Sequence, residues 1–96
     1  MGMTDRALRI ESTVRQTFAP TALQIVDDSA RHAGHAGAAP GGQTHYSVVM
    51  VAASFEGVSR VERSRAVHAA LAGELAGGLH ALALTLRTPA EAERLR

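Results

Sequence analysis

Cysteine, tryptophan and lysine are all absent from the 96 residues, and only three residues are Phe or Tyr. Without cysteine the chain can supply no disulfide, no thiol nucleophile and no thiolate metal ligand. Its five histidines are therefore the natural donors to a soft metal ion. The scarcity of aromatic residues predicts a core of Leu, Val, Ile and Ala, with Phe18, Tyr46 and Phe55 as its large pieces.

Long apolar runs and blocks of like charge are missing as well. No run approaches the ~20 residues of a membrane-spanning helix, and no apolar signal region follows the N-terminus, so we expect a cytoplasmic protein without a membrane partner. The ten basic residues, all arginine, are interleaved with nine carboxylates, and the net charge is +1. Because non-specific nucleic-acid binding depends on clustered positive charge, the composition does not predict it.

Three segments have patterns typical of helices. Residues 4–18 repeat apolar side chains every three or four positions, as one face of a helix requires. Residues 59–75 begin with a Ser-x-x-Glu capping box, and Gly77-Gly78 supplies the left-handed residue that ends a helix. A second capping signal at Thr88, followed by proline, predicts a short charged helix at the end of the chain.

Three further segments are typical of strands. Residues 21–27 alternate in polarity, residues 44–53 are rich in β-branched and apolar side chains, and residues 79–87 alternate between large and small apolar residues, with His80 opening the strand. The first two predict an antiparallel pair, and the apolarity of the second predicts a central position in the sheet. The glycine-rich segment 30–43 between them predicts an exposed connection.

The resulting element order is αββαβα. It predicts an α+β fold in which helices pack on a small mixed three-stranded sheet. The length fits one domain with a single core, and we assign residues 4–92 to it. We expect residues 1–3 and 93–96 to be disordered ends.

Five sequence pieces, in this order and at nearly this spacing, resemble the BolA family. They are DDSARH (27–32), THYSVVMV (44–51), FEGVSRVERSR (55–65), VHAALAGEL (67–75) and LHALALTLRTPAE (79–91). The resemblance spans nearly the whole chain and implies a fold similar to the type II KH domain. Two features depart from the family pattern: Ser64 stands where the family usually has His inside Arg-x-Arg, and the glycine-rich loop is longer than average.

The resemblance also implies a partner and a cofactor. BolA proteins are known for pairing with monothiol glutaredoxins, often around a shared two-iron two-sulfur cluster to which the glutaredoxin and bound glutathione contribute thiolates. The family's principal cluster ligand is matched by His80, and its second ligand position aligns best with His32. His35 lies in the same glycine-rich segment, so either loop histidine can fill this role. The isolated chain is expected to hold no cofactor.

A plainer alternative exists for each histidine. Taken without the family, His80 shares the parity of three leucines and fits a histidine at the margin of the core. The His32 and His35 pair fits a solvated loop, because short histidine spacings are common and weakly specific. We assign His45 and His68 to structural roles.

Nucleic-acid binding is the competing function. A KH-like fold contacts single strands through a loop and a helix, and Gly57, Arg60, Arg63 and Arg65 lie at the corresponding place. The plainer interpretation of these arginines is a solvated helix face. An enzyme is the least favoured class, because the chain has no nucleophile elbow, phosphate loop or HExxH motif. The sequence leaves open whether the chain forms a homodimer and whether it binds DNA.

Overall fold

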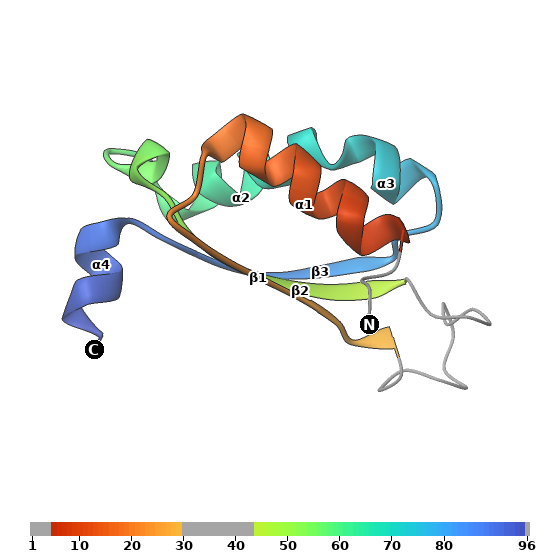
Figure 1. Cartoon of the computed structure of the whole chain (residues 1–96). Helices are drawn as coiled ribbons and strands as arrows, with labels where there is room; N and C mark the ends of the chain where they lie inside the picture. Colours follow the sequence, from red (N-terminus) through yellow and green to blue (C-terminus); the bar gives the residue numbers. More distant parts are fainter. Residues whose placement is uncertain (1–4, 30–43, 96) are drawn as a thin grey trace.

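A computed structural model describes residues 5–29 and 44–95 (Figure 1). The elements follow the predicted order, with one short 3₁₀ helix added and the central helix divided. They are α1 (Asp5–Phe18), β1 (Ala22–Asp27), β2 (His45–Val51), η2 (Ala53–Phe55), α2 (Arg60–Ala70), α3 (Ala72–Ala76), β3 (Ala81–Arg87) and α4 (Pro89–Arg94). The α+β fold class is confirmed.

The sheet has the strand order β1-β2-β3, with β1 antiparallel and β3 parallel to β2. The central place of β2 and the antiparallel first pair were both predicted, and both are confirmed. Helices α1, α2 and α3 cover one face of this sheet, while α4 lies beyond the end of β3 (Figure 1). Alternation along β2 sets the two faces: Tyr46, Val48 and Met50 are buried, whereas their neighbours are only partly covered.

Helix α1 buries the face that its periodicity predicted. Ala7, Ile10, Val14 and Phe18 all belong to the core. The helix ends at Phe18, after which Ala19 adopts a φ of 48° and donates its N–H to the Arg15 carbonyl oxygen. Proline at position 20 disfavours a further helical turn, so the chain turns here into β1.

The three aromatic residues occupy the core as expected. Phe18 and Phe55 pack with ring centroids 5.3 Å apart at an interplanar angle of 41°, a tilted arrangement that aromatic pairs favour. Tyr46 is 1% exposed. Aliphatic side chains from the helices and from β2 fill the remaining core, as the composition indicated.

The central helix is not continuous, which corrects the prediction of one helix over residues 59–75. It breaks at Leu71, where φ is −102° and ψ is 17°, while the Leu71 side chain remains 1% exposed. The break comes two residues before Gly73, whose helix propensity is low. The break thus coincides with a stretch of low helix propensity, and the Leu71 side chain remains part of the core.

The helix termini bear out the capping signals to different degrees. At α4 the capping box is complete, since the Thr88 hydroxyl accepts from the Glu91 N–H and the Glu91 carboxylate accepts from the Thr88 N–H. At α2 the Ser59 hydroxyl accepts from the Glu62 N–H, but the Glu62 carboxylate bonds to Arg65.

Helix α4 continues to Arg94, beyond the domain boundary expected at residue 92. The predicted disorder of residues 1–3 falls outside the described residues. Within the described residues, 5–29 and 44–95, no helix has the length and apolarity needed to cross a membrane. The cytoplasmic location stays a prediction.

Candidate functional site

His80 lies immediately before β3 and is exposed, while Leu79 beside it is buried at 3% exposure. The turn that delivers it contains Gly78 at a φ of 118°, a conformation that L side chains rarely adopt. The backbone N–H of His80 donates to the Thr44 carbonyl oxygen at 2.8 Å. The backbone at His80 is thus fixed to the sheet while its imidazole is left accessible.

The His45 ring lies beside the His80 ring. Their ring centroids are 6.2 Å apart at an interplanar angle of 30°. The parallel register pairs His45 with Ala81, which places residue 80 at the same end of the sheet. The sequence assigned His45 to structure and missed this proximity, because the register of two strands separated by 29 residues of other structure has no local signal.

The two ends of the segment carrying His32 and His35 are joined beside these rings. The Ser29 hydroxyl accepts from the Thr44 N–H at 2.9 Å and from the His45 N–H at 3.1 Å. The Ser47 hydroxyl also donates to the Asp28 carboxylate. His32 and His35 themselves lie outside the described residues, so their predicted roles stay predictions.

A charged clamp holds the turn that precedes His80. Glu74 of α3 accepts from Arg6 at 2.9 Å and from Arg9 at 2.7 Å, both on α1, and Arg6 also donates to the Gly77 carbonyl oxygen at 2.8 Å. Hydrogen bonds from Arg9 and Arg6 hold the pKa of the Glu74 carboxyl below its ordinary value, against a smaller opposing effect of burial. The clamp ties α1, α3 and the glycine turn into one unit.

The described residues can supply imidazole but not a complete metal site. Among residues 5–29 and 44–95, no group of three or more His, Cys, Asp or Glu side chains is placed to hold a metal ion. A two-iron cluster takes four protein or thiol ligands. His80 fits such a group as one neutral nitrogen donor, and the remaining ligands have to come from elsewhere.

Arg63 lies inside the protein, although the sequence offered it as a nucleic-acid contact. Its side chain is 6% exposed and donates to both carboxylate oxygens of Glu91, at 2.6 and 3.1 Å. It donates further to the carbonyl oxygens of Val58 and Leu86, and its guanidinium lies 5.8 Å from the centre of the Phe55 ring. Its donors are used within the fold, so we assign Arg63 a structural role.

The ion pair perturbs Glu91 strongly. The hydrogen bond from Arg63, reinforced by the Thr88 backbone N–H, lowers the pKa of Glu91 from its usual value near 4.5 to about 2. The carboxylate therefore stays charged well below neutral pH.

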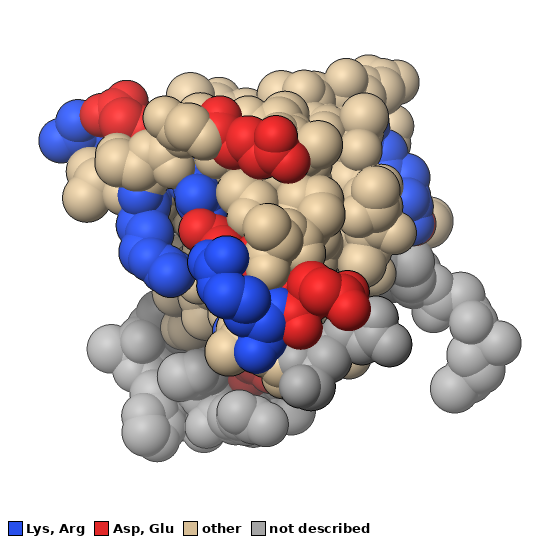
Figure 2. Space-filling view, turned by 90° about the vertical axis from the view of Figure 1, so that its left-hand side faces the viewer, with Lys and Arg blue, Asp and Glu red and all other residues tan. Residues whose placement is uncertain are grey.

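The other proposed nucleic-acid contacts are exposed. Arg60 and Arg65 lie on α2, where Arg65 forms a surface ion pair with Glu62 at 2.7 Å. Gly57 adopts a φ of 76° in the turn before the helix, which is a sufficient structural reason for glycine there. On the α4 side of the molecule the arginines are interspersed with carboxylates, so they do not form a continuous basic surface (Figure 2).

His68 fits the structural role assigned from sequence. It lies on α2, and its Nδ1 atom is 2.9 Å from the carbonyl oxygen of Ser64, one helical turn earlier. Its ring is exposed and lies in a different element from the pair formed by His45 and His80.

The chain is similar to known proteins over most of its length. The family model described as BolA-like protein matches residues 14–91. BolA-like protein 1 of Pongo abelii is 44% identical over 82 residues, which cover 85% of this chain and 57% of that protein. The chain therefore spans little more than half of the length of this relative. The protein named DNA-binding transcriptional regulator BolA of Escherichia coli (strain K12) is 40% identical, with 92% of this chain and 80% of that protein covered.

Solved structures agree with the sequence comparison. The BolA domain of SufE1 from Arabidopsis thaliana superposes with a TM-score of 0.85 at 37% identity, covering 94% of this chain and 99% of that domain. BolA1 from the same plant gives a TM-score of 0.81 at 36% identity, covering 93% and 98%. Family model, sequence identity and fold agree, and the chain belongs to the BolA-like family.

Proposed function

We propose that this protein is a non-enzymatic adaptor that binds a monothiol glutaredoxin and shares with it a histidine-ligated two-iron two-sulfur cluster. His80 would be one ligand, and one of His32 or His35 the second. The observation that carries the proposal is the accessible His80 imidazole, held at the start of β3 by a fixed backbone and a glycine turn. BolA-like family membership supports the same assignment.

The position of the loop ends supports a second ligand from the loop. The Thr44 carbonyl oxygen, at one end, accepts a hydrogen bond from the His80 N–H, and the Ser29 hydroxyl, at the other end, accepts one from the Thr44 N–H. Since consecutive Cα atoms are 3.8 Å apart, a residue three positions after Ser29 lies at most about 11 Å from it. His32 occupies that position, and His35 follows three residues later.

Imidazole ligands determine how such a cluster would behave. Neutral histidines in place of thiolates raise the reduction potential of a two-iron cluster. Imidazole must also be deprotonated to bind metal, so ligation weakens as the pH falls. Both properties suit transfer or sensing of a cluster better than permanent storage.

The contact surface for the glutaredoxin would include α2 and β3. These two elements approach each other on the helix-covered side of the sheet, and β3 begins next to His80. A partner bound there could place its cysteine and glutathione thiolates on one iron while His80 ligates the other.

Anaerobic cluster reconstitution with a monothiol glutaredoxin, followed by visible circular dichroism, tests the proposal. We expect the wild type to change the spectrum of the glutaredoxin cluster, and His80→Ala to abolish the change while remaining folded. His68→Ala is the matched control, because this exposed histidine lies away from the His45 and His80 pair. His32→Ala, His35→Ala and His45→Ala, made singly, identify the second ligand. An unchanged glutaredoxin spectrum with wild-type protein would reject the proposal.

Nucleic-acid binding remains the second candidate because the Escherichia coli relative is named a DNA-binding transcriptional regulator. Arg60 and Arg65 are exposed and could contact phosphate, whereas the buried Arg63 could not. Binding driven by phosphate contacts should weaken steeply as the salt concentration is raised. Arg60→Gln should reduce the slope of the logarithm of the affinity against the logarithm of the salt concentration by about one. Cluster-bridged assembly with glutaredoxin should depend on iron, sulfide and His80.

A further inference from the structure

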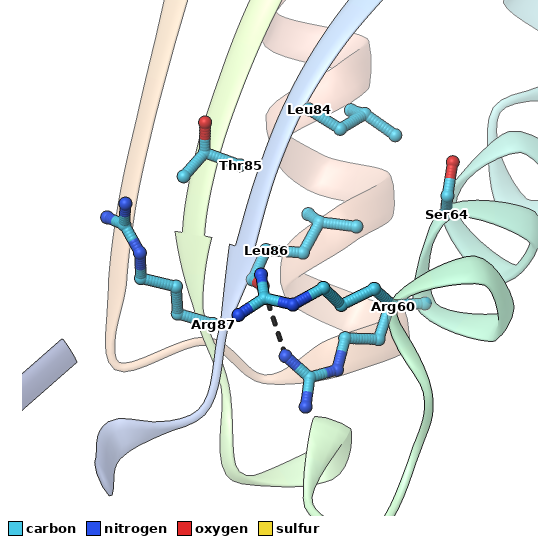
Figure 3. A pocket seen from close by; sticks show the side chains of 7 residues that line it. Arg60, Ser64, Leu84, Thr85, Leu86 and Arg87 are labelled. Atoms are coloured by element: carbon cyan, nitrogen blue, oxygen red, sulfur yellow. Dashed lines mark hydrogen bonds between the residues drawn. The ribbon is translucent and has the colours of Figure 1, made fainter. Parts of the chain in front are cut away.

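A groove of about 340 Å³ lies between the start of α2 and the end of β3 (Figure 3). Arg60, Arg63 and Ser64 line one side, and residues 84–87 line the other. The strand rises about 3.3 Å per residue, so the end of β3 lies about 20 Å from its start beside His80. The groove is therefore separate from the candidate cluster site.

The groove borders a free strand edge. β3 is the last strand of the sheet, and the hydrogen bonds at its two ends indicate that its odd-numbered residues face β2. Ala81 N–H donates to the Thr44 carbonyl oxygen at 3.1 Å, and the Arg87 carbonyl oxygen accepts from the Ala52 N–H at 2.9 Å. Because backbone groups alternate in direction along a strand, the even-numbered residues direct their N–H and C=O groups away from β2.

Part of this edge is already used. The outward carbonyl oxygen of Leu86 accepts from Arg63 at 3.2 Å. Within the described residues, the outward backbone groups of Leu82 and Leu84 have no hydrogen-bond partner. An unpaired edge of this kind can accept another strand.

Two arginines flank the edge, one on each face of the sheet. In Figure 3 the Arg60 side chain reaches from α2 toward β3, on the side to which Leu84 and Leu86 point, whereas Arg87 points to the opposite side. Neither guanidinium has an ion-pair partner among the described residues, whereas Arg63 is neutralised by Glu91. The surface around the free edge thus carries two guanidinium groups without a direct ion pair, and the Glu91 carboxylate, already paired with Arg63, acts on Arg60 only at longer range.

We propose that this edge binds an extended acidic peptide segment of a partner protein, which adds to β3 as a further strand. The backbone of the segment bonds to the outward groups of Leu82 and Leu84. Successive side chains of a strand point to opposite faces, so two adjacent carboxylates meet Arg60 on one face and Arg87 on the other. The apolar wall formed by Leu84 accommodates a neighbouring aliphatic side chain.

The groove favours a peptide over a nucleic acid. None of the described residues that line it is aromatic, and single-stranded nucleic acids depend on stacking against aromatic rings. It borders the backbone groups of a strand edge, whose spacing matches that of another peptide backbone. No histidine takes part in this binding, so it is separate from cluster ligation by His80, although the groove lies on the α2 and β3 surface proposed for the glutaredoxin.

Fluorescence anisotropy with the wild-type chain and a labelled peptide tests the inference. The probe is acetyl-Val-Thr-Glu-Glu-Val-Thr-Val-amide, and a matched peptide carries Gln-Gln in place of Glu-Glu. We expect the Arg60→Gln, Arg87→Gln double variant to bind the acidic peptide at least about tenfold more weakly, as loss of two charge-assisted hydrogen bonds predicts. Arg65→Gln, which removes an exposed charge of α2 outside the groove, should change affinity by less than about twofold.

Amide chemical shifts locate the bound peptide. The ¹H–¹⁵N resonances of Leu82 and Leu84 should move most on titration with the acidic peptide. The inference would be overturned if the acidic and Gln-Gln peptides bound equally well. It would also be overturned if the double variant and Arg65→Gln had equal effects, or if only amides of other elements shifted. A ten-residue oligothymidylate that moves the same amides with higher affinity than the peptide would also overturn it, in favour of a nucleic-acid groove.

Discussion

The two ends of β3 present opposite uses of polar side chains. At the start of the strand, the imidazoles of His45 and His80 lie together, and the His80 ring is exposed. At its end, Arg63 and Glu91 are joined by two hydrogen bonds, and Arg63 also caps two backbone carbonyl oxygens. At the start of the strand the His80 imidazole is accessible to a partner, whereas at its end the donors of Arg63 are used within the fold. The difference separates residues that present chemistry from residues that fix the architecture.

The end of β3 at which Arg63 and Glu91 pair, which we call the closed end in contrast to the open end with His80, explains how α2 and α4 are held to the same strand. Glu91 completes the capping box of α4 and also binds Arg63 of α2. Arg63 reaches the Leu86 carbonyl oxygen of β3. One buried cation therefore joins three elements, whereas the exposed His80 ring at the opposite end of β3 joins none.

Breaking the closed end should give the largest loss of stability. Arg63→Met leaves the Glu91 carboxylate without its cation and the Leu86 carbonyl oxygen without its donor. Removal of one partner from a buried ion pair is strongly destabilising, so we expect the thermal midpoint to fall by about 10 °C or more. Arg65→Met, which breaks an exposed pair on the same helix, should lower it by less than about 2 °C. Equal losses would show that Arg63 is not a structural centre.

Acid should weaken the same end next. The folded state lowers the pKa of Glu91 from near 4.5 to about 2, so the pair contributes its full stability above the higher value and loses it as the pH falls toward the lower one. The pKa of Glu74 is shifted in the same direction. The melting temperature of the wild type should therefore decrease as the pH is lowered from about 5 to about 2. Glu91→Gln should show a flatter profile, and parallel profiles would contradict the assignment.

A smaller effect is expected at the turn that delivers His80. Gly78→Ala should destabilise the protein by about 1 kcal/mol, because its φ of 118° strains any L side chain. A β-carbon there would meet only the Arg6 guanidinium at ordinary contact distance, so crowding adds little. Gly73→Ala, in open space within α3, should instead stabilise by about 0.5 kcal/mol. Urea unfolding of both variants measures the contrast, and destabilisation of the same size in each would refute it.

The smallest stability effect is expected at the open end itself. His80→Ala removes an exposed ring whose loss leaves the backbone bond to Thr44 intact. We expect the thermal midpoint to change by less than about 2 °C. A loss comparable to that of Arg63→Met would mean that His80 is a residue of the fold and would remove the distinction between the two ends.

Much of the fold could be predicted because its signals are local. The periodicity of α1 identified the four residues that it buries, and Thr88 with Glu91 identified the start of α4. The β-branched and apolar residues of 44–53 indicated the central strand. Each of these signals depends on neighbours within a few positions along the chain.

The two main omissions depend on distant contacts. Arg63 is buried although arginine is usually exposed, because Glu91, 28 residues later, supplies its counter-charge. His45 lies beside His80 only through the register of β2 and β3. The break at Leu71 was also missed, since both helix segments satisfy the same apolar pattern. Neither the ion pair nor the register has a signature in a short sequence window.

Nitrogen hyperfine spectroscopy of the reduced cluster in the complex with a monothiol glutaredoxin tests the central claim most directly. The sample would contain ¹⁵N-labelled protein and unlabelled glutaredoxin, with His80→Ala and His68→Ala prepared in parallel. We predict strong ¹⁵N coupling from directly ligated imidazole in the wild type and in His68→Ala, and its loss or reduction in His80→Ala. A cluster spectrum without ¹⁵N coupling in the wild type, or with coupling unchanged in His80→Ala, would contradict the assignment of His80 as a cluster ligand.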